Sequence, residues 1–192
     1  LGLRYPNAGY GRGFRDWLEN GTEPYNSWGN GSAMRVSPVS WLYDDLDTVR
    51  RMARLSAEVT HNHPEGIKGA VSVAGAIYLA RTGSTMNELR KYVSRFYKID
   101  FTLNQIRPTY GFYETCQDSV PQAFEAFFES VSFEDAIRNA ISLGGDADTQ
   151  ACIAGGIAEA YYKEIPEHIK RFCDGRIDSS IKSVVREFNQ KY

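Results

Sequence analysis

The stretch PEGIKGAVSVAGAIYLAR, residues 64–81, decides the fold, because it reads as one long helix made to be buried. Pro64 stands where the first turn of a helix tolerates proline, since the missing N–H would have no partner there. Small side chains then recur, and they let other helices approach closely. These are Gly69, Ala70, Ala74, Gly75 and Ala76. The stretch predicts a helix from Pro64 to about Arg81 at the centre of a helical packing.

Helical signals continue on both sides of this stretch. Apolar residues from Asp47 onward fall at helical spacing, and a shorter helical segment stands around residues 14–19. Three pairs have the spacing of a capping box at a helix start: Thr85 with Glu88, Ser119 with Gln122 and Ser132 with Asp135. Further helices are expected over about 148–162, 166–174 and 178–190. Only residues 101–106 resemble a strand, and weakly, so we expect an all-α, compact single-domain helical globule over residues 1–192.

The composition excludes several classes of protein. The net charge is −2 with both signs interspersed, so no basic stripe suggests nucleic acid or an anionic membrane. No apolar run approaches the roughly 20 residues of a membrane span, and the first residues lack the apolar core of a secretory signal. Three cysteines, Cys116, Cys152 and Cys173, stand at wide spacing. They favour reduced thiols in a cytoplasmic protein over disulfides or a zinc site.

Residues 1–43 are rich in Gly, Asn, Ser and Pro, which is the composition of loops. So long a loop-rich region in a compact domain is unusual unless it lines a site. We therefore expect one loop-rich face on the helical globule.

The strongest chemical signal is GGDADT, residues 144–149. Two carboxylates, Asp146 and Asp148, stand where one helix ends and the next begins, and the glycines before them allow close approach of a ligand. With the Thr149 hydroxyl they form a set of hard oxygen donors suited to Mg²⁺ or Mn²⁺. The alternative is that Asp146 merely caps the next helix, since Asp is a leading N-cap residue.

Two further segments carry weaker signals. In WGNGSAMR, residues 28–35, glycines flanking Asn30 expose N–H groups that can cradle a phosphate, and Arg35 could join them. The alternative is a Gly-Asn turn with a surface arginine. In THNHP, residues 60–64, His61 and His63 could contact a substrate or bind a metal. The alternative is a corner between helices, with residue 62 or His63 as the cap.

A group of aromatic residues, Tyr110, Phe112 and Tyr113, stands in a loop just before Glu114. Exposed loop aromatics suit stacking on an adenine ring, and core packing of at least one of them is the alternative.

Together these segments resemble the ADP-ribosylglycohydrolase family, which includes the dinitrogenase reductase-activating glycohydrolase. Residues 29–35 are similar to its GNG-x-x-MR loop and residues 60–64 to its TH-x-HP corner. Residues 144–149, continuing into 154–156, resemble its C-terminal metal motif. The three segments occur in the family's order, and the resemblance covers essentially the whole chain.

The resemblance implies an all-α hydrolase with a dinuclear Mg²⁺ or Mn²⁺ centre. Such an enzyme cleaves the glycosidic bond at the anomeric carbon of an ADP-ribosyl group on a protein or a small molecule. The metal ligands by resemblance are Asp146, Asp148 and Thr149. The residues implied to line the ADP-ribose pocket are Asn30, Gly31, Ser32 and Arg35, with His61 or His63 facing the same cleft. The linkage cleaved, the metal and the oligomeric state stay open.

The sequence departs from the family in one respect. Members also carry an earlier Gly-Asp…Gly-x-x-x-Glu segment and a Thr-Asp-Asp-Thr segment, which supply the other ligands and an acidic catalytic residue, and neither occurs here. We expect that about 60–80 residues of the family domain are missing at the N-terminus. This chain alone would then be weakly active or inactive, with its catalytic acid outside it. The alternatives are a degenerate module that binds ADP-ribose or a nucleotide, and a purely structural helical domain.

Overall fold

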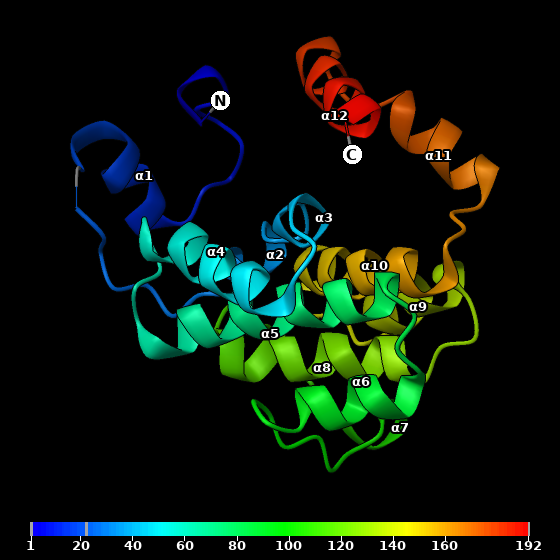
Figure 1. Cartoon of the computed structure of the whole chain (residues 1–192). Helices are drawn as coiled ribbons and strands as arrows, with labels where there is room; N and C mark the ends of the chain where they lie inside the picture. Colours follow the sequence, from blue (N-terminus) through cyan, green and yellow to red (C-terminus); the bar gives the residue numbers. More distant parts are fainter. Residues whose placement is uncertain (1, 22, 192) are drawn as a thin grey trace.

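The computed structural model describes residues 2–21 and 23–191, and they form helices joined by loops (Figure 1). In chain order the elements are η1 (Gly2–Arg4), α1 (Arg12–Asn20), α2 (Gly31–Met34), α3 (Val39–Leu42), α4 (Leu46–Glu58), α5 (Pro64–Arg81), α6 (Met86–Val93), α7 (Leu103–Ile106), α8 (Cys116–Phe128), α9 (Phe133–Ser142), α10 (Ala147–Tyr162), α11 (Glu167–Asp174) and α12 (Ser179–Lys191). Among the described residues, β pairing is limited to an isolated bridge between Gly29 and Thr115. The all-α prediction is confirmed.

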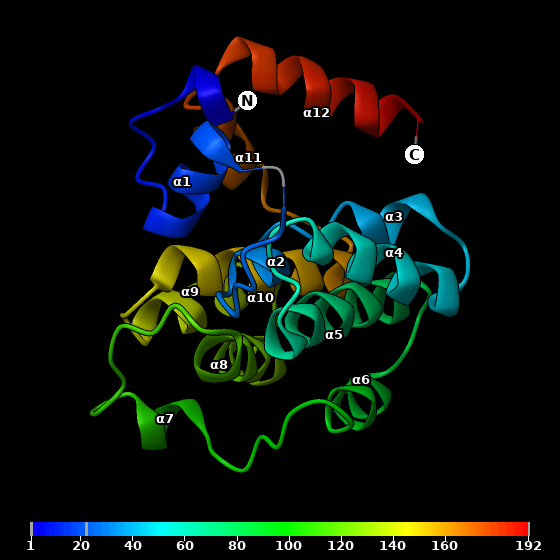
Figure 2. The ribbon, with the colours of Figure 1, turned by 90° about the vertical axis from the view of Figure 1, so that its left-hand side faces the viewer.

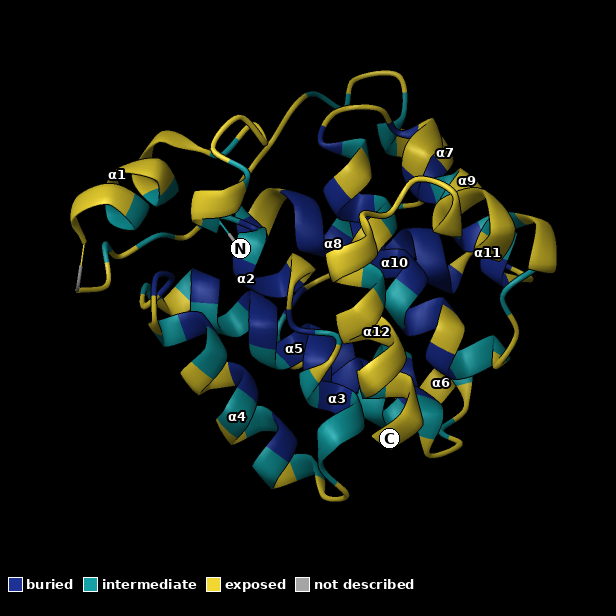
Figure 3. Cartoon of the chain, turned by 90° about the horizontal axis from the view of Figure 1, so that it is seen from above, coloured by how far each residue is buried: buried dark blue, intermediate teal, exposed yellow. Residues whose placement is uncertain are grey.

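The core is built around α5 and α10, which pack against each other. Helix α5 also packs against α2, α4 and α8, and α10 packs against α8 and α9. Figure 3 shows the buried residues gathered in α5, α8 and α10. Glycines permit this close packing, because a Cβ on Gly75 would overlap the Tyr92 hydroxyl and one on Gly69 would stand 2.5 Å from Cys116 Sγ.

The helices near the two chain ends lie on one side of this core. Figures 1 and 2 place α1, α11 and α12 on the same side of the core, above α2, α3 and α10 in both views. None of these three terminal helices has a buried residue among those described. They therefore contribute little to the hydrophobic core, which is formed by the helices that run from α2 to α10 along the chain.

Most predicted helix starts agree with the structure. Thr85 and Glu88 form the expected capping box of α6, and Ser132 accepts from Asp135 N at the start of α9. Pro64 opens α5, and His63 Nδ1 accepts from the backbone N–H of Glu65 at 3.1 Å. The alternative proposed for residues 60–64, a corner capped by His63, is therefore confirmed.

Two local predictions are wrong. Helix α8 starts at Cys116 and is capped by Thr115, so Ser119 lies inside the helix and not at its start. The reason is that Thr115 and Asp118 offer the same N-terminal capping pattern earlier in the chain. Residues 101–106 are no strand, because Thr102 and Gln105 form a capping box that starts the short helix α7.

Cys116, Cys152 and Cys173 are free thiols, as expected from their spacing. In the described part of the chain, no helix combines the length and apolar character that crossing a bilayer requires.

Candidate functional site

The turn between α9 and α10 places the acidic motif against the core. Gly144 and Gly145 have φ angles of +72° and +64°, a region that side chains rarely adopt. A Cβ on Gly145 would also overlap the carbonyl oxygen of Gly111 and stand 3.1 Å from Tyr110 Cε1. The two glycines therefore let the chain reverse in close contact with the loop around residue 111. Asp146 follows directly from this turn.

Asp146 occupies the N-cap position of α10, but its side chain makes no capping hydrogen bond. Its Oδ2 instead accepts a 2.6 Å hydrogen bond from Asn30 Nδ2, and the carboxylate is buried, with 9% of the residue exposed. The interpretation of Asp146 as a simple capping residue is therefore wrong. Two segments that are 116 residues apart in the chain meet at this hydrogen bond.

The Asp146 carboxylate has no cationic partner in the part of the chain that the structure describes. Burial is the main effect that raises the pKa of its carboxyl, and the nearby Asp148 carboxylate raises it further. The hydrogen bond from Asn30 and the nearby Thr149 hydroxyl act in the opposite direction. No Lys, Arg or His forms an ion pair with Asp146 or Asp148 among the described residues. The start of α10 is therefore a concentration of negative charge that a cation would stabilise.

The donor chemistry at this point fits a hard divalent cation. Asp146, Asp148 and Thr149 supply carboxylate and hydroxyl oxygens, which Mg²⁺ and Mn²⁺ prefer. Asp148 is exposed, whereas Asp146 and Thr149 are buried. Over residues 2–21 and 23–191, no group of three or more His, Cys, Asp or Glu side chains is placed to hold a metal ion. A divalent cation held by these three side chains would therefore need further ligands.

The loop that carries Asn30 is fixed to the start of α8. Asn30 N donates to the Glu114 carbonyl at 2.8 Å, and Cys116 N donates to the Trp28 carbonyl at 3.0 Å. The same loop reaches α10, because Thr149 Oγ1 donates to Met34 Sδ at 3.4 Å. Residues 28–35 and the acidic motif therefore form one contiguous region.

The corner at residues 60–64 also adjoins the Asn30 loop. A Cβ on Gly31 would stand 3.2 Å from His61 Nε2, so a side chain at position 31 would crowd the imidazole. Ser32 is 1% exposed, and its hydroxyl donates to the Gly66 carbonyl at 2.7 Å. Gly31 and Ser32 thus join the loop to the corner through close packing and a buried hydrogen bond.

Arg35 and His61 are joined through Thr60. The Arg35 guanidinium donates to Thr60 Oγ1 and to the Ser56 carbonyl, both at 3.0 Å, and Thr60 Oγ1 lies 2.7 Å from His61 Nδ1. Burial, and secondarily the Arg35 charge, lower the pKa of His61 to about 4. The imidazole is therefore neutral near pH 7, and Arg35 is bound to the corner itself.

His63 is held as the cap of α5 and packs edge-on against Trp28, with ring centroids 5.4 Å apart. The indole of Trp28 is 49% exposed. An exposed aromatic ring therefore stands directly beside the Asn30 loop.

The loop aromatics divide into two groups. Tyr110 packs against the core, and its hydroxyl accepts from Gln150 Nε2 and donates to the Asp118 carbonyl. Phe112 and Tyr113 are 65% and 44% exposed. The alternative given for these residues, core packing of at least one of them, is confirmed for Tyr110.

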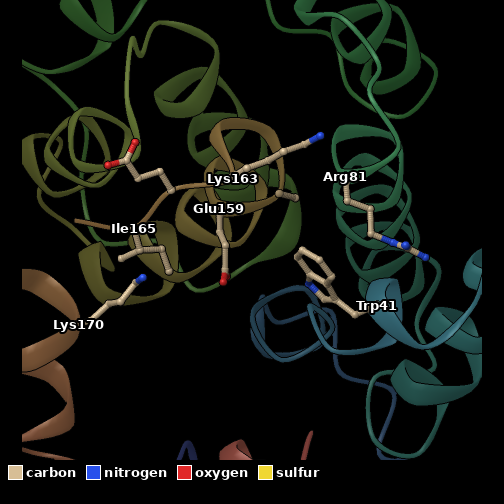
Figure 4. A pocket seen from close by; sticks show the side chains of 8 residues that line it. Trp41, Arg81, Glu159, Lys163, Ile165 and Lys170 are labelled. Atoms are coloured by element: carbon tan, nitrogen blue, oxygen red, sulfur yellow. The ribbon is translucent and has the colours of Figure 1, made fainter. Parts of the chain in front are cut away.

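A cavity of about 400 Å³ opens away from these motifs, at the other end of α10. Trp41, Glu159 and Lys170 are among its lining residues, and Figure 4 shows the Glu159 carboxylate between the other two side chains. Arg81 also lines it, but donates to the Ser40 and Tyr43 carbonyls. None of the predicted site residues lines this cavity.

One residue of the motif region escaped the sequence patterns. Ser119, taken from its spacing for a capping residue, is fully buried and accepts from Asn30 Nδ2 at 3.1 Å. Recognising Thr115 as the true cap would have moved Ser119 into α8, but no spacing rule would have paired it with Asn30.

Comparison with known proteins gives consistent matches. The sequence pattern of the ADP-ribosylglycohydrolase family matches residues 3–192. The human protein named ADP-ribosylhydrolase ARH3 is 31% identical over 240 aligned positions, which cover 92% of this chain and 66% of the human protein. The ADP-ribosyl-dinitrogen reductase glycohydrolase of Rhodospirillum rubrum is 27% identical, covering 91% of this chain and 62% of its own length.

A solved structure described as an ADP-ribosylglycohydrolase-related protein complex superposes with a TM-score of 0.67 at 26% identity. The match covers 86% of this chain and 63% of that one. The chain thus spans a little less than two thirds of the length of these relatives.

Proposed function

The chain belongs to the ADP-ribosylglycohydrolase family, and from this we propose that it forms part of a metal-dependent hydrolase acting on ADP-ribosyl groups. The proposed reaction is hydrolysis of the glycosidic bond at the anomeric carbon of the ribose. The substrate would be an ADP-ribosylated protein or a small ADP-ribose conjugate, in keeping with the names of the relatives.

The observation that carries this proposal is the hydrogen bond between Asn30 and Asp146. It joins the glycine-rich loop to the acidic motif, which a common site for ribose and phosphate requires. Asp148 and Thr149 lie beside Asp146 and influence its pKa, so three oxygen-bearing side chains gather at one helix start.

Asp146, Asp148 and Thr149 are the residues that would hold Mg²⁺ or Mn²⁺. A bound divalent cation would supply Lewis-acid stabilisation of developing negative charge and a lower pKa for a water molecule. The chain's own part is to hold the carboxylates in place: Gly145 lets the backbone approach residue 111, and Asn30 fixes one oxygen of Asp146.

The loop at residues 30–35 and the corner at 60–64 would form the adjoining wall of an ADP-ribose pocket. The side chains of Ser32, Arg35 and His61 already have partners within the chain, so they would set the shape of this wall. His63 would do the same as the cap of α5. The exposed indole of Trp28 would offer a surface on which a base can stack.

In the proposed hydrolysis a water oxygen bonds to the anomeric carbon while the bond to the leaving nitrogen or oxygen breaks. A proton passes to the leaving atom, through an oxocarbenium-like transition state. We assign no residue of this chain to that proton transfer, because the resemblance places the acidic group in a segment that this sequence lacks.

A second candidate is a module that binds ADP-ribose or a nucleotide without hydrolysing it. The incomplete donor set among the described residues favours this reading. It retains the same pocket wall and differs only in having no turnover.

Release of ADP-ribose separates the two functions. The protein encoded by the longest reading frame that contains this chain should be assayed on ADP-ribosylated arginine, ADP-ribosylated serine and O-acetyl-ADP-ribose, with Mg²⁺ or Mn²⁺ and with EDTA. We expect turnover with either metal and its loss in EDTA. The 192-residue chain alone should be slower by several orders of magnitude, because part of the catalytic group is missing.

The matched variants for this assay are Asp148→Asn and Asp100→Asn. The first removes a proposed ligand, and the second alters an acid that pairs with Lys98 outside the site. Loss of turnover in Asp148→Asn but not in Asp100→Asn supports the hydrolase function. Binding of ADP-ribose with no turnover on any substrate would favour the binding module, and full, EDTA-insensitive turnover by the 192-residue chain would contradict the metal mechanism.

A further inference from the structure

We propose that Ser119 is a positioning residue, which orients the amide of Asn30 so that this amide holds Asp146 in place. The inference rests on the proposed function for its meaning in catalysis. The hydrogen-bond arrangement itself stands on the geometry of α8, the Asn30 loop and the start of α10.

The hydroxyl of Ser119 can play only one role toward Asn30. Ser119 Oγ lies 2.6 Å from the Thr115 carbonyl oxygen, which can only accept, so the hydroxyl proton is directed there. The lone pairs of Ser119 Oγ therefore face the side-chain amide of Asn30, 3.1 Å away. The atom of Asn30 that faces Ser119 must therefore be a donor, which is Nδ2.

The orientation of the Asn30 amide follows from this contact. The NH₂ group has two hydrogens, and its second partner is Asp146 Oδ2 at 2.6 Å. A reversed amide would turn its carbonyl oxygen toward Asp146 and Ser119, where both partners need a donor. Ser119 thus excludes the reversed orientation, and the buried carboxylate keeps its hydrogen bond.

The burial of these groups assigns Asn30 to the protein interior. Asn30 is 6% exposed and Ser119 is fully buried, and both amide hydrogens of Asn30 already have partners within the chain. The Asn30 backbone is fixed as well, by its N–H to the Glu114 carbonyl. The amide nitrogen of Asn30 therefore acts on substrate through Asp146, whereas the family resemblance alone assigned Asn30 to the substrate pocket.

The consequence of losing Ser119 differs from that of losing an ordinary buried hydroxyl. Residues that orient metal ligands typically change metal affinity by about 10- to 100-fold when removed. Ser119→Ala should therefore weaken Mn²⁺ binding about 10-fold. Ser72→Ala is the matched control, because Ser72 is also fully buried in a helix and donates to a backbone carbonyl, that of Gly69 at 2.9 Å.

The test combines Mn²⁺ titration with nuclear magnetic resonance of the Asn30 side-chain amide. That amide is identified by its absence from Asn30→Asp. In the wild-type chain and in Ser72→Ala, we expect it to be slow to exchange with solvent and shifted from the free-amide position. In Ser119→Ala it should exchange faster and move toward that position, and Mn²⁺ should bind about 10-fold more weakly.

Unchanged amide resonances and unchanged Mn²⁺ affinity in Ser119→Ala would overturn the proposal, as would an equal loss in Ser72→Ala. Failure of the proposed function is distinguishable from this, because the amide readout needs neither substrate nor turnover. A protein without ADP-ribose release that still shows the Ser119-dependent amide would retain the positioning role and lose only the hydrolase.

Discussion

The two ends of α10 both carry acidic side chains, in opposite electrostatic settings. Asp146 at the start is buried and has the neutral amide of Asn30 as its partner. Glu159 lies about 20 Å further along the helix, from the 1.5 Å rise per residue. Burial raises the pKa of Glu159, but the Lys170 ammonium acts against that rise. Among the described residues, the acidic charge is therefore partly compensated at the end of α10 and uncompensated at its start.

This difference separates the cavity from the proposed metal site. The cavity of about 400 Å³ lies at the compensated end. Two of the three cations that line it have a structural explanation, because Lys163 is the C-cap of α10 and Arg81 is the last residue of α5. Helix C-termini favour positive charge. No such explanation covers Asp146, which occupies a cap position without capping.

The largest expected effect is on catalysis. Asp146→Ala in the protein that releases ADP-ribose should lower the rate about 100-fold or more, since it removes a group that acts in the transition state. Glu159→Gln at the other end of α10 should leave the rate within about 2-fold, as surface changes away from a site usually do. Steady-state rates with Mn²⁺ measure both. An Asp146→Ala enzyme as active as wild type, or an equal loss in Glu159→Gln, would break the comparison.

The next effect concerns the turn that delivers Asp146. Gly145→Ala should lower the free energy of unfolding by about 2–3 kcal/mol, because its φ is +64° and the new Cβ would displace the Gly111 carbonyl. Gly156→Ala within α10 is the control, since its Cβ would meet Ile77 at an ordinary 3.4 Å. Urea unfolding of the two variants should separate them clearly. Equal free energies of unfolding in the two variants would mean that the turn accommodates the new Cβ without strain.

His61, in the proposed pocket wall beside Asp146, should make the free energy of unfolding fall in acid. The pKa of His61 is about 4 in the folded chain and near 6.5 when unfolded, so between these values the unfolded state binds more protons. Stability should be unaffected by His61 above pH 6.5 and should fall as the pH drops toward 4, by about 3 kcal/mol. Urea unfolding between pH 4 and 7 should show a shallower decline for His61→Gln. Parallel curves would contradict the buried, neutral imidazole.

The smallest effect is expected at the compensated end. Lys170→Met should change the free energy of unfolding by no more than about 0.5 kcal/mol, because a single surface charge near a carboxylate contributes little in water. Thermal or urea unfolding can check this. A loss as large as that of Gly145→Ala would show that the charges around Glu159 are structurally essential.

The helical fold could be predicted because its signals are local. Pro64, the Thr85–Glu88 box and the glycines before Asp146 each act within a few residues. The start of α8 was misplaced because Thr115 and Ser119 both fit the spacing of a cap, and only the folded chain selects between them. The first residue of a helix is therefore hard to predict when two possible caps lie close together, even where the apolar pattern of the helix is strong.

The candidate site was predicted as three segments, but not as an arrangement. Resemblance named Asn30 and Asp146 together, yet nothing in the spacing indicated that their side chains would hydrogen-bond. The internal partners of Arg35 and His61 were equally invisible, because they depend on how α4 and α5 meet. Contacts between distant segments are set by packing, which no pattern of neighbouring residues contains.

The most direct test of the central claim is where Mn²⁺ binds on the 192-residue chain. Paramagnetic broadening of backbone amide resonances detects even weak binding, so an incomplete ligand set does not prevent the measurement. The predicted result is broadening centred on residues 144–149, extending to residues 29–31 and 111, and lost in Asp146→Ala. Broadening centred instead on Glu159 and the cavity at the end of α10, or spread evenly over exposed acids, would contradict the account.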